Sequence, residues 1–152
     1  MKGKNKEISG LEVHLGYWLR YVSNQVSHSF AQKVQAKGVT VAEWVLLRQL
    51  YDGESRPGQL AQSLGLTRGA ISKLSERLLN KGLIDRNQEE DGRAHCLKLN
   101  ARGRQLIPVL SRLADQNDEE YFGHLEPEIR KMIQCAMEEI VQMKGLKSKP
   151  IG

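Results

Sequence analysis

Basic and hydroxyl side chains are concentrated between residues 67 and 77, and their chemistry suits a nucleic acid. Arginine can donate two hydrogen bonds to a guanine edge, and serine can bond to several bases. Lysine, arginine and threonine side chains also bind phosphate oxygens, and such contacts position a protein on duplex DNA. The segment therefore predicts a DNA-reading surface, whose candidate contacts are Thr67, Arg68, Gly69, Ser72, Lys73 and Arg77.

These candidate contacts must lie on the exposed side of one helix. Apolar residues recur at three- and four-residue steps, as a buried helix face requires, at Ile71, Leu74 and Leu78. Thr67 is a good N-cap and Gly82 a good stop for a helix that runs to about Lys81. Arg68 and Ser72 then lie at the N-terminal end, where we expect base contacts. The other cations, together with Thr67, are better placed for phosphates.

A short helix and a tight turn precede this reading helix. Pro57 fits the first turn of a helix, and Ser55 could cap it. The inner side of this short helix would be formed by Leu60, Ala61 and Leu64. Gly65 can take the left-handed conformation that ends it, and a single residue then separates that glycine from Thr67. Two helices joined so tightly form a helix-turn-helix, in which the second helix enters the major groove.

The pattern changes from helix to strand after the reading helix. Residues 83–86 and 96–99 are expected to form two strands, and 87–95 the hairpin loop between them. At the tip of this loop, Arg93 could enter a minor groove, with Asp91 holding the guanidinium in one orientation. An acidic turn with an incidental arginine is the alternative interpretation.

Longer helices are expected on both sides of this central region. Apolar stripes predict one over 11–37 and two within 101–145, and a shorter helix over 40–51 begins with a Thr40–Glu43 capping box. The first and last stripes exceed what one small domain can cover, so they predict a partner. A second copy of this chain would match a two-fold DNA site, and a different protein is the alternative. The last eight residues, GLKSKPIG, have a composition that frays.

Charge and length limit the class of protein. The chain has 152 residues and a net charge of +5, which is enough length for one domain. Residues 56–104 hold ten basic and five acidic side chains, whereas residues 105–152 hold six and eight. A polyanion partner or an ordinary solvated surface would explain this distribution. The sequence has neither an apolar run of the roughly 18–20 residues of a membrane span nor a secretory signal, so we expect a cytoplasmic protein with no membrane partner.

With these motifs in place, the chain resembles the MarR family of winged helix-turn-helix transcriptional regulators. Residues 60–103 carry the resemblance through L-A-x-x-L-G, L-x-x-K-G-L-I-x-R, D-x-R and L-x-L-N-x-x-G, in that order. The resemblance implies a mainly α (α+β) fold with a small β-hairpin wing. It also implies one MarR-type domain over 1–152, with a winged helix-turn-helix lobe at 40–100 and dimerisation helices at 11–37 and 101–145.

The same resemblance implies roles for single residues and for partners. Asp91 and Arg93 would form the wing pair, and Arg86 would close the first wing strand beside the DNA. The chain would be a homodimeric repressor on a pseudo-palindromic operator, released by a small aromatic or phenolic effector. The dimerisation side chains would be Leu11, Leu15, Trp18, Leu19, Leu125, Ile129, Ile133, Met137 and Ile140.

The sequence also bears on rival classes of function. It contains no Ser–His–acid spacing, Gly-rich phosphate loop or metal-ligand cluster, so we expect no enzyme, cofactor or metal site. The main rival is a winged helix whose basic face docks an acidic protein. Trp18, Tyr21 and Trp44 could line an effector pocket, although aromatics at helical spacing are more often core. Cys96 could be a stabilised thiolate, whereas Cys135 is expected on an apolar helix face.

Overall fold

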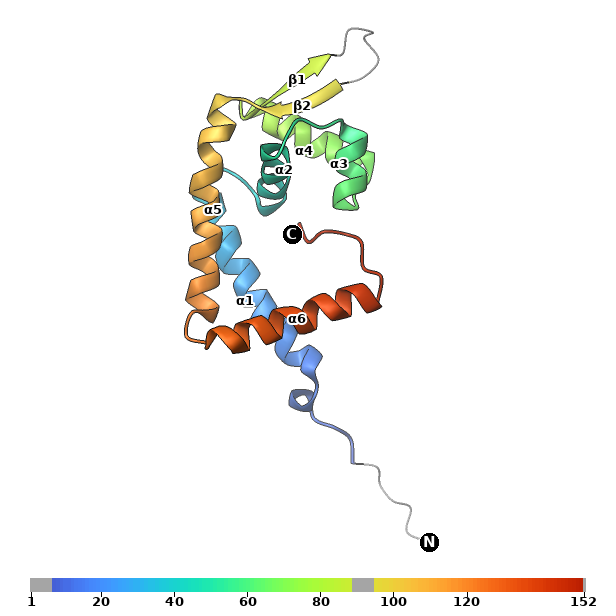
Figure 1. Cartoon of the computed structure of the whole chain (residues 1–152), viewed down its shortest axis with the longest axis vertical. Helices are drawn as coiled ribbons and strands as arrows, with labels where there is room; N and C mark the ends of the chain where they lie inside the picture. The colour runs from blue at the N-terminus through green and yellow to red at the C-terminus, as the bar shows by residue number, and fades with distance from the viewer. Residues whose placement is uncertain (1–6, 89–94, 152) are drawn as a thin grey trace.

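The computed structural model describes residues 7–88 and 95–151, which form a set of helices and one small antiparallel sheet (Figure 1). In Figure 1, α5 stands upright along one side, α6 runs from the lower end of α5 across α1, and the two strands project at the top. The elements in chain order are η1 (Leu11–Val13), α1 (Leu15–Gln35), α2 (Val41–Tyr51), α3 (Pro57–Leu64), α4 (Arg68–Asn80), β1 (Ile84–Gln88), β2 (His95–Leu99), α5 (Ala101–Phe122) and α6 (Pro127–Met143).

The first helix begins later than the apolar stripe predicts. Leu11–Val13 form a separate 3₁₀ turn, and His14 is extended, with φ −96° and ψ 127°. The regular helix therefore runs over Leu15–Gln35 rather than 11–37. Gly38, at φ +83°, follows the helix end, as the sequence predicts.

Side-chain caps start three of the helices, and those at Thr40 and Thr67 are as predicted. Thr40 and Glu43 form a reciprocal capping box at the start of α2. At the start of α4 the N–H of Ala70 donates to Thr67 Oγ1 at 3.1 Å. At the start of α5 the N–H of Gly103 donates to the Asn100 side chain at 2.9 Å. Each cap satisfies a backbone donor that the helix itself leaves unpaired.

The hairpin gains a third backbone partner that the sequence does not reveal. β1 and β2 pair antiparallel, with Ile84 opposite Leu99. Ser55 pairs with Leu97 on the other side of β2, through N–H···O bonds of 3.0 and 2.8 Å. The expectation that Ser55 caps α3 is therefore wrong. Arg56 occupies the N-cap position, and its N–H donates to Gln59 Oε1 at 3.0 Å.

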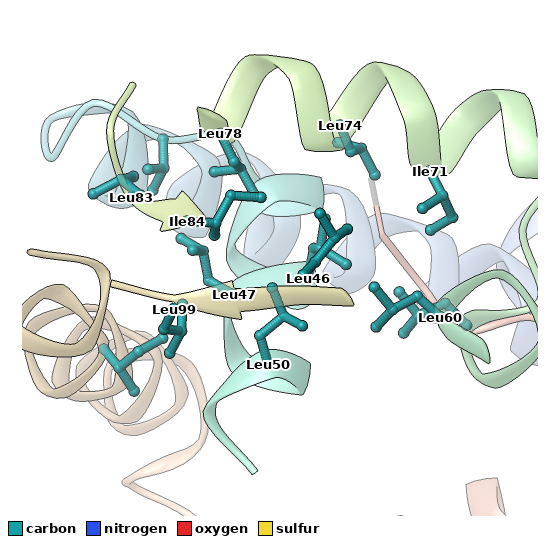
Figure 2. Packing of buried hydrophobic residues seen from close by; sticks show 14 of the residues in the cluster. Leu46, Leu47, Leu50, Leu60, Ile71, Leu74, Leu78, Leu83, Ile84 and Leu99 are labelled. Carbon is teal, nitrogen blue, oxygen red and sulfur yellow. The ribbon is translucent and has the colours of Figure 1, made fainter. Parts of the chain in front are cut away.

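A leucine-rich core holds the winged-helix lobe, residues 40–100, together and joins it to α5. Figure 2 shows side chains from α2, α3, α4 and the hairpin converging on one cluster. The largest fully buried members are Leu46, Leu47, Leu50, Leu60, Ile71, Leu78, Ile84, Leu97 and Leu110. Burying each such side chain contributes about 1.5–3 kcal/mol. Because α4 supplies two of these residues, the core fixes which side of that helix faces outward.

A polar cluster joins α1 to α5 below the lobe. Asn117 is 4 % exposed, and its Nδ2 donates to the backbone carbonyl of Val26 at 3.1 Å. Lys33 Nζ donates to Asn117 Oδ1 at 2.9 Å and to Glu120 Oε2 at 2.7 Å. The amide of Asn117 therefore uses both its donor and its acceptor at this helix crossing.

A buried carboxylate links α2 to the C-terminal end of α4. Glu43 is 1 % exposed, and Lys81 Nζ donates to its Oε2 at 2.7 Å. Arg77 Nε lies 3.6 Å from Glu43 Oε1. Lys81 Nζ also donates to the carbonyl of Gly38 at 2.9 Å, so the same lysine reaches the end of α1.

We expect Glu43→Ala to lower the free energy of unfolding by about 2 kcal/mol, because it removes a helix cap and the carboxylate that pairs with Lys81. Urea denaturation would measure this loss. The matched control is Glu54→Ala, which removes an exposed carboxylate and should change stability by less than about 0.5 kcal/mol. Equal stability of the two variants would contradict the linking role of Glu43.

Candidate DNA-binding surface

The outward side of α4 is polar and basic along its length. The helix buries Ile71, Leu74, Ser75 and Leu78. The structure brings the predicted contacts together on the exposed side, namely Thr67, Arg68, Gly69, Ser72, Lys73 and Arg77. Ser75, which the sequence analysis did not single out, faces inward and donates to the carbonyl of Ile71 at 2.7 Å.

The turn before α4 has the geometry that its sequence predicts. Gly65 is left-handed, with φ +68° and ψ 32°. The N–H groups of Gly65 and Leu66 return to the carbonyls of Gln62 and Ala61, which closes the end of α3. Thr67 follows at once as the cap of α4, so the turn is tight enough for a helix-turn-helix.

Arg68 is positioned by the helix that precedes it. A Cβ atom at Gly58 would lie 3.2 Å from Arg68 Nη2, so the guanidinium rests across the first turn of α3. Gly58 therefore leaves room for this side chain. Arg68 itself stays exposed at the start of α4, where a groove-entering helix presents its first residues.

Two arginines near the surface also contact glutamates of the lobe. Arg86 Nη2 donates to Glu76 Oε1 at 3.0 Å, which ties β1 to α4. Arg77 lies beside Glu43, while its side chain remains 53 % exposed. These contacts give both arginines a part in positioning the hairpin and the helix. A DNA contact by Arg77 or Arg86 stays a prediction.

The predicted wing pair, Asp91 and Arg93, lies outside the described residues. The described strands end at Gln88 and resume at His95. Their antiparallel register extends as far as the Gln88–His95 pair. The hairpin that would carry a wing is therefore present, and the roles of Asp91 and Arg93 stay predictions.

The expected dimerisation side chains form an exposed apolar surface. On η1 and α1, Leu15 is 87 % and Leu19 58 % exposed, and on α6 Ile140 is 55 % exposed. The other large apolar residues that are exposed on these elements include Leu11, Trp18, Ile129, Ile133 and Met137, while Leu125 is half-buried. Arg130 attaches the start of α6 to Asp118 of α5 at 2.9 Å, and every residue from 131 to 143 is exposed.

The aromatic and cysteine residues differ from one another in their surroundings. Ring contacts join Trp18 and Tyr21 to Tyr17 on α1, whereas Trp44 packs against the lobe core. The three candidate effector-pocket aromatics therefore do not share one cluster. Cys135 is exposed on α6, as is every residue from 131 to 143, so its expected place on an apolar face stays a prediction. Cys96 is half-buried on β2.

The described part of the chain lacks two other kinds of feature. Among residues 7–88 and 95–151, no group of three or more His, Cys, Asp or Glu side chains is arranged to hold a metal ion. Within those same ranges, no helix combines the length and the apolar character that crossing a membrane requires.

Two ion pairs of the lobe, Glu43–Lys81 and Glu76–Arg86, were not predicted from the sequence. Glu43 was predicted only as a capping partner, because that role is visible three residues from Thr40. Lys81 lies 38 positions further along the chain. No local spacing indicates such a contact, although a glutamate within an apolar helix face is a signal that a cation must be near.

Known sequences of one kind match part of this chain. A sequence model described as MarR family matches residues 37–94. An uncharacterised HTH-type transcriptional regulator of Mycobacterium bovis is 31 % identical over 101 residues, which is 63 % of this chain and 64 % of that protein. Two counterparts in Mycobacterium tuberculosis match equally. The match thus spans a little under two thirds of these relatives, which are described as HTH-type transcriptional regulators.

Solved structures share the fold of this chain. The Staphylococcus aureus MepR–DNA complex has a TM-score of 0.75 at 21 % identity, covering 86 % of this chain and 98 % of MepR. Bordetella bronchiseptica BpsR, whose DNA binding is regulated by 6-hydroxynicotinic acid, also has a TM-score of 0.75, at 21 % identity, covering 88 % of this chain and 96 % of BpsR. Over residues 37–94 the chain is thus similar in sequence to the MarR family, and its winged helix-turn-helix fold is that of the solved MepR and BpsR structures.

Proposed function

We propose that this chain is a cytoplasmic, sequence-specific regulator of transcription that binds double-stranded DNA as a homodimer. The observation that carries the proposal is the exposed basic side of α4, directly behind a tight turn. In this arrangement the first turn of α4 enters the major groove. The structural likeness to MepR, which was solved with DNA, supports the same use of the fold.

The residues of this surface take two kinds of role. Arg68 and Ser72 read base edges, since they lie near the start of α4. Thr67, Lys73 and Arg77 bind phosphates, and Gly69 allows the backbone to approach. Arg86 contacts DNA from β1 while Glu76 holds it. Arg93 enters the minor groove, oriented by Asp91.

A homodimer would cover the apolar side of α6. This helix is attached to its own chain at its start, through Arg130, and exposes large apolar side chains along its length. An isolated helix of this length is marginal in water, and an exposed patch of this kind marks an interaction surface. A second copy would cover both this stripe and that of α1, and would give the two-fold symmetry of a pseudo-palindromic operator.

The dimer would act as a repressor that a small aromatic or phenolic compound releases. BpsR, whose DNA binding 6-hydroxynicotinic acid regulates, supports this kind of control. A hollow beside α5 offers basic and apolar groups to such a compound, through Lys37, Lys81, Arg102, Leu83 and Leu106. Screening aromatic acids for release of labelled operator DNA would test this idea, and Arg102→Ala should then weaken the response. An unchanged response would exclude this hollow.

Arg68→Ala should relax sequence preference at one base position and cost about 1–3 kcal/mol of specific binding, because it removes a bidentate base contact. Lys73→Ala should weaken binding to all sequences and lower the slope of log K against log salt by about 1, because it removes one phosphate contact. Selection from a random DNA pool, followed by salt titrations, would measure both effects.

The matched control for these variants is Arg112→Ala, which removes an exposed cation from α5 and should change neither quantity. A wild-type protein that shows no salt-sensitive binding to any selected DNA would overturn the proposal. Salt-insensitive capture of an acidic protein by the same surface would then favour the rival function, docking of a protein partner.

Met137→Glu should dissociate the dimer, because it places a charge in the centre of the apolar stripe on α6, where Met137 is 44 % exposed in the single chain. Sedimentation at micromolar concentration would report a shift to the mass of one chain. Gln142→Glu makes the same charge change on the polar side of α6 and should leave the mass unchanged. If both variants sediment alike, α6 is not the dimer surface.

A further inference from the structure

The chain beyond α6 follows a defined path back toward the lobe. Gly145 is left-handed, with φ +60°. The N–H of Gly145 donates to Gln142 O at 3.1 Å, and the N–H of Leu146 donates to Val141 O at 3.0 Å. This left-handed cap ends the helix and directs the following residues away from its axis. In Figure 1 the tail leaves the end of α6 and turns back beneath α3. The backbone is thus described up to Ile151, along a tail whose composition alone predicts fraying.

The tail makes a backbone hydrogen bond to the turn of the helix-turn-helix. The N–H of Lys149 donates to the carbonyl of Leu64, the last residue of α3, at 3.1 Å. The two N–H groups that follow Leu64 are already used within the turn, on the carbonyls of Gln62 and Ala61. The tail thus supplies a partner for a helix-end carbonyl, one of the groups that a helix leaves unsatisfied.

Close packing accompanies this hydrogen bond. A Cβ atom at Gly65 would lie 2.7 Å from the Cα of Ser148 and 3.3 Å from the carbonyl oxygen of Lys147. Glycine therefore serves two needs at position 65, the left-handed turn and the approach of the tail backbone. Ile151 is half-buried, whereas all residues from 141 to 150 are exposed.

We propose that residues 146–151 form a strap that ties the turn between α3 and α4 to the end of α6. The turn runs directly into Thr67, the cap of α4, so the strap restrains the N-terminal end of that helix relative to α6. The strap acts through its backbone, since the contacts that define it involve the Lys149 N–H, the Ser148 Cα and the Lys147 carbonyl. The consequence for DNA binding rests on the proposed function, whereas the strap itself does not.

The experiment compares Lys149→Pro with Lys149→Ala in the full chain. Proline removes the N–H donor, whereas alanine keeps it and removes only the charged side chain. We expect Lys149→Pro to speed amide hydrogen exchange at Gly65 and Leu66 by about three- to tenfold, the size of one lost backbone hydrogen bond. Lys149→Ala should exchange like the wild type. Equal exchange in both variants at these amides would overturn the strap.

A second pair of variants tests the packing. Gly65→Ala and Gly38→Ala both place alanine at a positive φ, +68° and +83°, but a Cβ at Gly38 meets nothing within 4 Å. Both should lose stability from backbone strain. Only Gly65→Ala should also speed exchange of the amides from 146 to 149, because its Cβ displaces the strap. Unchanged exchange in the tail of Gly65→Ala would contradict the packing.

DNA binding then reports what the strap does. Lys149→Pro should weaken operator binding by about three- to tenfold at an unchanged salt slope, and Lys149→Ala should bind like the wild type. If Lys149→Ala binds DNA more weakly and its slope of log K against log salt is lower by about 1, the lysine side chain binds phosphate. That result would overturn the proposal that the strap acts through its backbone. If the wild type binds no DNA, the proposed function fails, while the exchange measurements still decide whether the strap exists.

Discussion

The compensation of one buried charge determines how the winged-helix lobe is assembled. Glu43 is 1 % exposed, and an unpaired carboxylate in such a place would cost several kcal/mol. Its compensation comes from the backbone of Thr40, from Lys81 and from Arg77. Any movement of the end of α4 away from α2 would separate these charges. The C-terminal end of the reading helix is therefore held by electrostatics as well as by the leucine core.

The features that local chemistry dictates could be predicted from the sequence. Thr67 and Asn100 are caps because their side chains accept a hydrogen bond from the backbone N–H three residues further on. Such a short-range relation can be recognised in the amino-acid sequence. Gly65 ends α3 because the turn requires a positive φ. The apolar spacing of α4 likewise identifies its buried side. The remaining residues of that helix must then be exposed, and the candidate DNA contacts lie among them. For this reason the surface could be predicted from the sequence.

The features that depend on distant partners could not be predicted in this way. Ser55 looks like a cap, yet the adjacent strand offers its backbone two hydrogen bonds, and pairing with Leu97 satisfies both polar groups of that residue. The tail lacks any periodic pattern, so nothing local indicates that Leu64 supplies an acceptor for Lys149. An apolar stripe such as that of α6 also has the same spacing whether it packs on its own chain or on another one.

The two ends of α4 are thus restrained by different physical means. At its C-terminal end, charge pairs fix the helix to α2, and at its N-terminal end a single backbone hydrogen bond joins the preceding turn to the tail. That hydrogen bond is worth only about 1 kcal/mol, less than the burial of Ile71, which anchors the same end of α4 in the core. Asn117 prevents α1 and α5 from sliding, because shifting either helix would leave a buried amide unpaired. The tail therefore connects the end of α6 to the turn before α4, while the core packing of Ile71 and Leu78 sets the position of the helix itself.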